Sequence, residues 1–272
     1  MFTELFVIDP QNDFCDLPAQ PGRVPALPVA GAAADMQRLA AWLDAQGAAV
    51  SGVTLTLDSH PHIAIERPAF WVQENGAEVA PFTPITSQDV RARRYLPRNE
   101  ALVEATLGYL QALESRGKYT LMVWPAHCEI GSWGHNVHAE LSAAVQRWEE
   151  RAGRNGSKVL KGQNPLTESY SALCAEVPDS ADPSTHMNAK LGQRLAAADR
   201  IVIAGEASSH CVRATTQDLV QVFLGGRADK IVLLGDCMSP VTGFETQAQA
   251  FLAGMQSVGA QVRTTENFRL DL

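Results

Sequence analysis

The chain has 272 residues, of which 46% are apolar and 19% charged, and its formal net charge is -8 at pH 7. This composition supports a large hydrophobic core and excludes an intrinsically disordered protein. The negative charge argues against nucleic acid or an anionic membrane surface as the main partner, and no apolar run is long enough to span a bilayer.

The first nine residues lack a positively charged leader, so we expect a strand there and no signal peptide. The chain has five cysteines, an odd number without the spacing of a disulfide framework. Reduced thiols and a cytoplasmic location are the simplest interpretation.

Short apolar segments alternate with longer helical segments along the chain. The expected strands are 4–9, 49–57, 119–124, 158–160, 200–204, 230–234 and 261–265. The expected helices are 29–46, 99–116, 138–151, 188–197, 210–224 and 244–258. This alternation predicts an α/β fold, a Rossmann-like parallel sheet of about six strands flanked by helices on both faces. Active sites in such sheets lie beyond the carboxyl ends of the strands.

The segment at 62–98 departs from this alternation, because it is rich in proline and carries the basic cluster Arg91-Ala92-Arg93-Arg94. We interpret it as a long excursion inserted into one domain that spans 1–272. Long ordered loops in compact domains tend to be functional, so we expect it to cover one edge of the site. A loop with no role in the site is the alternative.

Cys211 begins an expected helix shortly after the apolar strand 200–204. The unsatisfied N–H groups of a helix start favour a thiolate, which is the nucleophilic form of cysteine. A buried structural cysteine would fit the same local pattern.

Two further strand ends carry ionisable groups that suit a thiol nucleophile. Asp9 ends the first strand, where a carboxylate can act as base towards a thiol and as acid towards a leaving amine. Lys161 follows the strand 158–160, and a lysine beside a cysteine stabilises the thiolate. A turn-capping aspartate and a solvated lysine are the alternatives.

A metal site is indicated by Asp58 and His60, which follow the second strand, and by His127 after the strand 119–124. The Asp-x-His spacing places two ligands on one side of an extended segment. Two imidazoles and a carboxylate suit a divalent transition metal, zinc first, with iron or manganese also possible. Histidines at the starts of surface loops are the alternative.

Taken together, these segments resemble the nicotinamidase branch of the isochorismatase-like cysteine hydrolases. The motifs that carry the resemblance are Val7-Ile8-Asp9-Pro10-Gln11-Asn12-Asp13-Phe14, Asp58-Ser59-His60-Pro61, Trp124-Pro125-Ala126-His127-Cys128, Lys161-Gly162 with Glu168-Ser169-Tyr170-Ser171-Ala172, and Gly205-Glu206-Ala207-Ser208-Ser209-His210-Cys211-Val212. They occur in the family's order, and the likeness covers the chain apart from the excursion.

The resemblance implies a catalytic triad of Asp9, Lys161 and Cys211. It also implies a cis peptide bond between Glu206 and Ala207, which would aim the amides of Ala207 and Cys211 at one point as an oxyanion hole.

The resemblance further implies metal ligation by Asp58, His60 and His127, with the metal orienting a ring nitrogen of the substrate. Phe14 and Trp124 could sandwich a flat ring, or both could be core aromatics. Relatives often carry another histidine or serine near the metal; His62 comes earlier than that position, and its role is left open.

The expected activity is hydrolysis of a small, nicotinamide-like carboxamide to the acid and ammonia through a thioester. Members of the family often form homo-oligomers, so we expect one here. Two alternatives remain: hydrolysis of a ureido, N-carbamoyl or other amide by the same triad, and a non-catalytic ligand-binding relative.

Overall fold

The computed structural model describes residues 1–270, and its centre is a six-stranded sheet in the order β10-β9-β8-β1-β2-β7. All neighbouring strands in it run parallel. The strands are β1 (Thr3–Ile8), β2 (Gly52–Asp58), β7 (Ser157–Lys161), β8 (Arg200–Gly205), β9 (Ile231–Leu234) and β10 (Gln261–Arg263). The α/β fold expected from the alternation of apolar segments is therefore confirmed.

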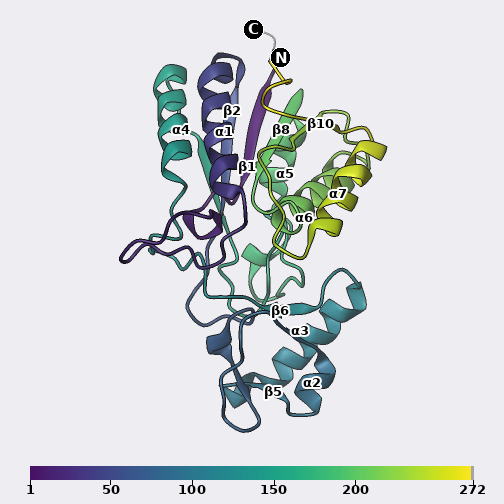
Figure 1. Ribbon diagram of the computed structural model, residues 1–272. Coiled ribbons are helices and arrows are strands. Elements are labelled where there is room, and N and C mark those ends of the chain that lie inside the picture. Colours follow the sequence, from purple (N-terminus) through teal and green to yellow (C-terminus); the bar gives the residue numbers. More distant parts are fainter. Residues whose placement is uncertain (271–272) are drawn as a thin grey trace.

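Helices cover both faces of this sheet (Figure 1). One face carries α1 (Ala32–Gln46) and α4 (Ala139–Ala152), and the other carries α5 (Ala189–Ala196), α6 (Cys211–Asp218) and α7 (Glu245–Ser257). A π-helical segment, Leu219–Phe223, continues α6. This arrangement follows from right-handed crossovers, which place helices on opposite faces when the chain moves in opposite directions along the sheet.

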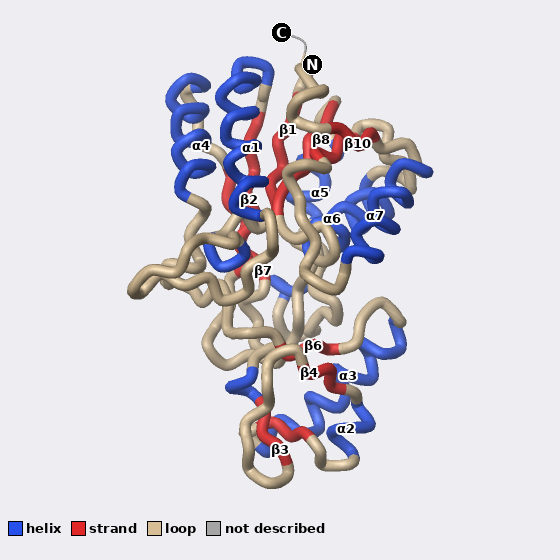
Figure 2. The backbone as a smooth tube through the Cα atoms, in the orientation of Figure 1, coloured by secondary structure: helices blue, strands red, loops and turns tan. Residues whose placement is uncertain are grey.

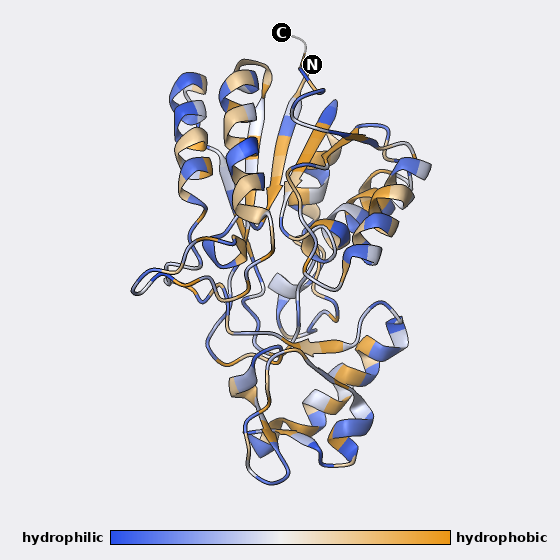
Figure 3. Cartoon of the chain, viewed as in Figure 1, coloured by the Kyte–Doolittle hydropathy of each residue, from blue (hydrophilic) through white to orange (hydrophobic). Residues whose placement is uncertain are grey.

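The central strands are buried on both faces, and their apolar side chains form the core between the helical layers (Figure 3). All six residues of β1 are buried, as are the last five of β8. A strand covered on both faces needs apolar side chains at successive positions, which is why these segments lack the alternation of a half-exposed strand.

The sheet reverses its direction of growth between β1 and β8. From β1 the chain continues to the neighbouring strand β2, and from β8 it continues to β9 on the opposite side. The loops that leave two such adjacent strands diverge, and the crevice between them is the usual binding site in open α/β sheets. Asp9 and Cys211 both follow these two strands, so the topology directs them to one crevice.

The residues between β2 and α4 contain a second lobe with its own hydrophobic core, seen below the main sheet in Figure 2. Its elements are β3 (Trp71–Gln73), β4 (Thr83–Ile85), α2 (Ser87–Arg91), β5 (Tyr95–Pro97), α3 (Val103–Arg116) and β6 (Leu121–Val123). Strand β3 pairs with β5 and β4 pairs with β6, both antiparallel. Phe70, Trp71 and Leu110 are fully or almost fully buried in this core.

One expectation for this region is wrong. The segment expected as a main-sheet strand at 119–124 forms β6, which pairs with β4 and lies outside the parallel sheet. The helix expected at 99–116 is present as α3, and it packs in the second lobe. Residues of β6 and α3 share one apolar core with Ile85, and local sequence cannot show which of two apolar surfaces a segment joins.

Within residues 1–270, no helix combines the length and the apolar character that crossing a membrane requires.

Candidate active site

The loop between β8 and α6 presents Cys211 as the first residue of its helix. The peptide bond between Glu206 and Ala207 is cis, at the position that the resemblance implies. The preceding residue has to be glycine, because Gly205 has φ +119° and a Cβ there would lie 1.9 Å from the Ile8 carbonyl oxygen. The backbone of the loop is thus held directly against the end of β1.

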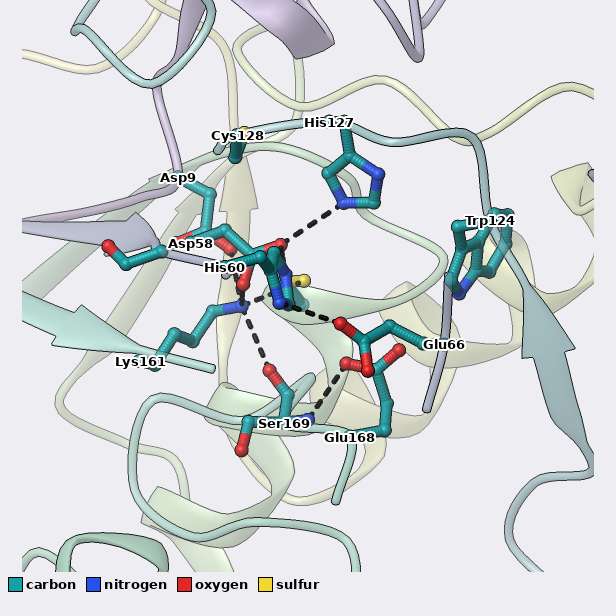
Figure 4. Close-up of polar contacts among 12 residues, drawn as sticks. Asp9, Asp58, His60, Glu66, Trp124, His127, Cys128, Lys161, Glu168 and Ser169 are labelled. Atoms are coloured by element: carbon teal, nitrogen blue, oxygen red, sulfur yellow. Dashed lines mark hydrogen bonds and ion pairs between the residues drawn. The ribbon is translucent and has the colours of Figure 1, made fainter. Parts of the chain in front are cut away.

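Lys161, the last residue of β7, lies beside the carboxylates of Asp9 and Asp58 (Figure 4) and also contacts Cys211. Its Nζ lies 3.0 Å from Asp9 Oδ2 and 3.5 Å from Cys211 Sγ. The same ammonium lies 2.8 Å from Asp58 Oδ1 and donates a 2.9 Å hydrogen bond to the Ser169 carbonyl. The three residues expected as a triad therefore share one buried cluster, although they come from three distant segments.

The resting protonation of this cluster follows from burial and charge. Burial raises the pKa of the Cys211 thiol well above its usual value; Lys161 opposes this effect and Asp9 adds to it. Burial lowers the pKa of Lys161, but the Asp58 and Asp9 carboxylates outweigh it and raise that pKa well above normal. Burial and the two carboxylates therefore favour the protonated thiol, whereas Lys161 favours the thiolate that the helix start was expected to stabilise.

Thr56 fixes the orientation of Asp9. The Thr56 hydroxyl donates a 2.5 Å hydrogen bond to Asp9 Oδ1 and accepts a 3.0 Å bond from the Asp9 backbone N–H. Burial raises the pKa of the Asp9 carboxyl, whereas Lys161 and this hydroxyl lower it. Thr56 thus holds the Asp9 carboxylate through Oδ1, and the other oxygen, Oδ2, is directed towards the Lys161 ammonium.

Asp58, His60 and His127 form the one metal-compatible group found within residues 1–270, with ligand atoms all within 4.8 Å of one another. Asp58 Oδ2 lies 2.8 Å from His60 Nε2 and 3.3 Å from His127 Nε2. Burial, reinforced by Arg67, lowers the pKa of His127 to about 4, so this imidazole is neutral. A carboxylate and two Nε2 atoms converging in this way fit a divalent transition metal.

Glu66 and Arg67 surround this group, and neither was expected from the sequence. The Glu66 carboxylate lies 2.9 Å from His60 Nδ1, which leaves Nε2 directed towards Asp58. Such carboxylate–histidine contacts orient metal ligands and increase their basicity. Burial lowers the pKa of His60, but Asp58 and Glu66 outweigh burial and Arg67 and raise it to about 9. Without a metal, His60 therefore holds a proton in this acidic cluster.

Arg67 is fully buried, and its guanidinium forms a hydrogen bond with the backbone two residues before His127. Its guanidinium donates a 2.7 Å hydrogen bond to the Pro125 carbonyl and lies 3.3 Å from Glu66 Oε1. His127 Nδ1 lies 2.8 Å from the same carbonyl. The strand that precedes His127 in the chain, β6, belongs to the second lobe, whereas the sequence predicts a strand of the main sheet there. The Pro125 carbonyl, next to that strand, fixes the orientation of the His127 ring.

Gly162 allows the metal-compatible group to approach the triad. Its φ is +78°, and a Cβ there would lie 2.8 Å from His60 Cε1 and 3.0 Å from Asp58 Oδ1. Only glycine combines this backbone conformation with so close an approach. By contrast, the His62 side chain is 70% exposed and pairs with Glu129 at 2.6 Å, so it lies outside the group.

A pocket with about 380 Å³ of empty space opens onto Cys211. Phe14 and Trp124, the two aromatic residues expected to hold a ring, both line it and are both almost fully buried. The other lining residues are Leu27, Asp58, His127, Glu168, Tyr170, Ala207, His210 and Val241. Within the pocket wall, Trp124 Nε1 donates a 3.0 Å hydrogen bond to the Tyr170 hydroxyl, and the Trp124 ring packs edge-on against His210.

Sequence reasoning missed the buried acids of the site. Glu66 lies in the excursion that the sequence predicts as a covering loop, and Glu168 lies in a motif that carries the resemblance but assigns it no role. A glutamate between polar or proline residues has the pattern of a solvated loop, and no local signal marks it as buried.

Relatives in sequence and in structure match almost the whole chain. A nicotinamidase from Escherichia coli (strain K12) is 26% identical over 261 residues, which cover 96% of this chain and 93% of that protein. The Acinetobacter baumanii nicotinamidase pyrazinamidease has a TM-score of 0.64 at 20% identity and covers 97% of both chains. No family model matches the sequence.

Two further solved structures share the fold. The pyrazinamidase of Pyrococcus horikoshii, solved in complex with zinc, has a TM-score of 0.56 at 19% identity and covers 96% of this chain and 98% of its own. The N-carbamoylsarcosine amidase of Thermoplasma acidophilum has a TM-score of 0.51 at 15% identity, with coverage of 98% and 99%. At these identities the structural likeness establishes the fold.

Proposed function

From the similarity of this chain to a nicotinamidase over almost its whole length, we propose that it belongs to the nicotinamidase-related branch of the isochorismatase-like hydrolases, hydrolyses the C–N bond of a small, uncharged carboxamide and releases ammonia. The observation that carries the proposal is the contact of one buried ammonium, Lys161 Nζ, with both Asp9 and Cys211, of which Cys211 lines the pocket. Such a cluster combines a nucleophile, a base and a fixed positive charge, which together are the requirements for covalent amide hydrolysis.

The first half-reaction transfers the acyl group to sulfur. Asp9 accepts the proton of the Cys211 thiol, and Lys161 stabilises the thiolate as it forms. The sulfur attacks the amide carbon, and collapse of the tetrahedral adduct breaks the C–N bond. Asp9 returns its proton to the departing nitrogen, so that ammonia leaves and a thioester remains. The raised pKa of the thiol is consistent with a step in which a base accepts its proton.

The second half-reaction regenerates the enzyme. Asp9 takes a proton from water, the resulting hydroxide attacks the thioester carbon, and the C–S bond breaks. The acid leaves, and the proton on Asp9 returns to the Cys211 sulfur. Water and amide are thus converted to acid and ammonia with no other reactant.

The amides of Ala207 and Cys211 are the proposed oxyanion donors. Among the hydrogen bonds of residues 1–270, neither N–H has an acceptor. Removal of one oxyanion donor commonly costs about 3–4 kcal/mol of transition-state stabilisation. These two amides are therefore free to bind the charge that develops on the carbonyl oxygen.

Asp58, His60 and His127 are the proposed ligands of a divalent transition metal, zinc first. When bound, such a metal would supply a Lewis-acid position for a ring nitrogen and so orient the amide over the sulfur. Within this chain, Glu66 orients His60 and the Pro125 carbonyl orients His127. Phe14 and Trp124 are the proposed walls for the flat ring.

The charge of the pocket favours a neutral substrate over an N-carbamoyl amino acid. Its ionisable lining residues are two acids, Asp58 and Glu168, and four other groups, His127, Tyr170, His210 and Cys211; no arginine or lysine is among its lining residues within 1–270. Burial lowers the pKa of His210 to about 4, so this imidazole is neutral. A substrate that carries a carboxylate would therefore meet no cationic side chain in the pocket wall.

Ammonia release from a panel of amides tests the proposal. We expect turnover of nicotinamide and pyrazinamide, much weaker turnover of benzamide, which lacks the ring nitrogen, and none of N-carbamoylsarcosine. Hydrolysis of N-carbamoylsarcosine alone would support the rival amidase activity. Absence of turnover throughout the panel would support a ligand-binding role.

Two variants test the residue assignments. Cys211→Ala should abolish turnover while the fold and the bound metal are retained, and activity close to that of the wild type would remove Cys211 as the nucleophile. The double variant Asp58→Ala, His60→Ala should lose the bound transition metal found by elemental analysis. Full metal stoichiometry in this variant would show that the metal binds elsewhere.

A further inference from the structure

Glu168 is a buried carboxyl group that lines the same pocket as Cys211 and has no step in the proposed reaction. Burial, together with Glu66, raises its pKa to about 8. Burying an acid close to Glu66 and Asp58 costs folding free energy unless hydrogen bonds compensate for it. The contacts of Glu168 therefore indicate what it does.

One of these contacts leads directly to the triad. Glu168 Oε1 accepts a 2.8 Å hydrogen bond from the Ser169 backbone N–H, and the Ser169 carbonyl accepts a 2.9 Å bond from Lys161 Nζ. Figure 4 shows both bonds as one path from the carboxyl group to the ammonium. The Glu168 side chain thus fixes the orientation of Ser169, whose carbonyl accepts the hydrogen bond from the Lys161 ammonium.

The second lobe holds the same segment from the other side. The Glu168 backbone N–H donates a 3.2 Å hydrogen bond to the hydroxyl of Tyr109, a buried residue of α3. The Glu168 carbonyl accepts a 2.9 Å bond from the Glu176 N–H. The N–H, the carbonyl and the side chain of Glu168 are therefore all occupied, and the segment has little freedom to move.

The Ser169 carbonyl matters because the Lys161 ammonium has three protons to donate. Its oxygen acceptors are Asp58 at 2.8 Å, Ser169 at 2.9 Å and Asp9 at 3.0 Å. Without the uncharged acceptor, the ammonium would move towards the two carboxylates and away from Cys211 Sγ at 3.5 Å.

We propose that Glu168 is a positioning residue, which fixes the Ser169 carbonyl so that Lys161 remains beside the Cys211 sulfur, and that Tyr109 of the second lobe supports it. This inference rests on the proposed function, because it assumes that Lys161 assists a Cys211 nucleophile. It gives the second lobe a role in the catalytic geometry, in addition to carrying Glu66 and Arg67.

Steady-state kinetics of Glu168→Ala and Glu168→Gln separate positioning from a chemical role of the carboxyl group. Loss of one hydrogen-bond acceptor in Glu168→Ala should lower kcat about tenfold, with KM unchanged within about twofold. Glu168→Gln should retain most activity, because its amide oxygen can accept the same Ser169 N–H. Glu176→Gln is the matched control on the neighbouring segment and should keep the wild-type kcat.

Tyr109→Phe tests the support from the second lobe and guards against misfolding of the alanine variant. It should lower kcat about threefold. The control Tyr95→Phe changes a tyrosine of the same lobe whose hydroxyl has no hydrogen bond among residues 1–270, and it should have no effect. Equal kcat values for the two phenylalanine variants would overturn the role of Tyr109.

The rate at which iodoacetamide alkylates Cys211, followed by peptide mass spectrometry, provides a readout that needs no substrate. Glu168→Ala should slow this reaction about tenfold, and Glu168→Gln should restore it. Wild-type rates in Glu168→Ala, or equal losses in the alanine and glutamine variants, would overturn the inference. A wild-type protein that releases no ammonia but shows this dependence would refute the proposed function and support the positioning.

Discussion

Replacing Lys161 by methionine should remove the positive charge that compensates the buried carboxylates of Asp9 and Asp58, while keeping most of the apolar bulk of the side chain. The Lys161 side chain is only 4% exposed, and its Nζ lies within 3.0 Å of both Asp9 and Asp58. Removal of one partner from a buried ion pair costs about 3–5 kcal/mol, because the remaining charge stays buried without compensation. We therefore expect the free energy of unfolding at pH 7 to fall by about that amount.

Urea unfolding in the presence of a chelator measures this loss without contributions from bound metal. The loss should depend on pH, because Lys161 helps to hold the pKa of Asp58 well below its usual value. The stability that Asp58 contributes is present above its unfolded pKa of about 3.9 and is lost as pH falls through the lower folded value. In Lys161→Met the pKa of Asp58 in the folded state rises. Protonation of Asp58 at lower pH then removes a buried, uncompensated charge, so the difference in unfolding free energy between the variant and the wild type should shrink towards about pH 4.

The matched control is Lys158→Met on the same strand, because Lys158 is exposed and has no ion pair within residues 1–270. Its stability should stay within about 0.5 kcal/mol of the wild type. Lys161→Met should also lower the rate of amide hydrolysis by about 10²–10⁴-fold. If the two methionine variants unfold at the same urea concentration at pH 7, the argument that Lys161 compensates buried carboxylates is wrong.

Three further predictions concern single residues. Gly162→Ala should weaken metal binding by about 10–100-fold in a chelator competition, because its Cβ would displace the His60 ring; unchanged affinity would contradict this. Burial raises the pKa of Glu176 to about 7, which costs stability as pH rises from 4.5 through 7. Glu176→Gln should therefore be more stable than the wild type by about 2–3 kcal/mol at pH 8 and by little at pH 4, and a gain that is independent of pH would count against this cause. His62→Ala should leave metal content and turnover unchanged, because its side chain is 70% exposed and pairs only with Glu129; metal loss would place it in the site.

The sequence contained the information for the main sheet because that information is local. Buried parallel strands require successive apolar residues, and the helices between them show apolar periodicity with glycine near their ends. The residues that follow such strands must lie at one edge of the sheet. The strand pattern therefore predicted one edge of the sheet for Asp9, Lys161 and Cys211, and the resemblance to a family implied that they form a triad; in the structure Lys161 contacts the other two.

Tertiary structure decided two features that local sequence patterns cannot distinguish: which sheet an apolar strand joins, and whether an acidic residue is buried. The segment 121–123 has the composition of a core strand, yet it pairs with β4 in a second lobe, because the apolar surface it joins is made by distant residues. Glu66 and Glu168 have the pattern of solvated loop residues, yet both are buried beside the triad. The burial of a charged side chain depends on partners that the chain supplies from elsewhere.

The amino-acid sequence by itself thus determined the strand–helix order, and with it the edge of the sheet at which the reactive groups gather. The three-dimensional packing decided that burial raises the pKa of the Cys211 thiol, that Arg67 is buried beside the histidines, and that the second lobe holds the segment carrying Ser169. The physical reason is that periodicity reflects short-range geometry, whereas protonation and burial depend on the summed field and solvent exclusion of the whole folded chain.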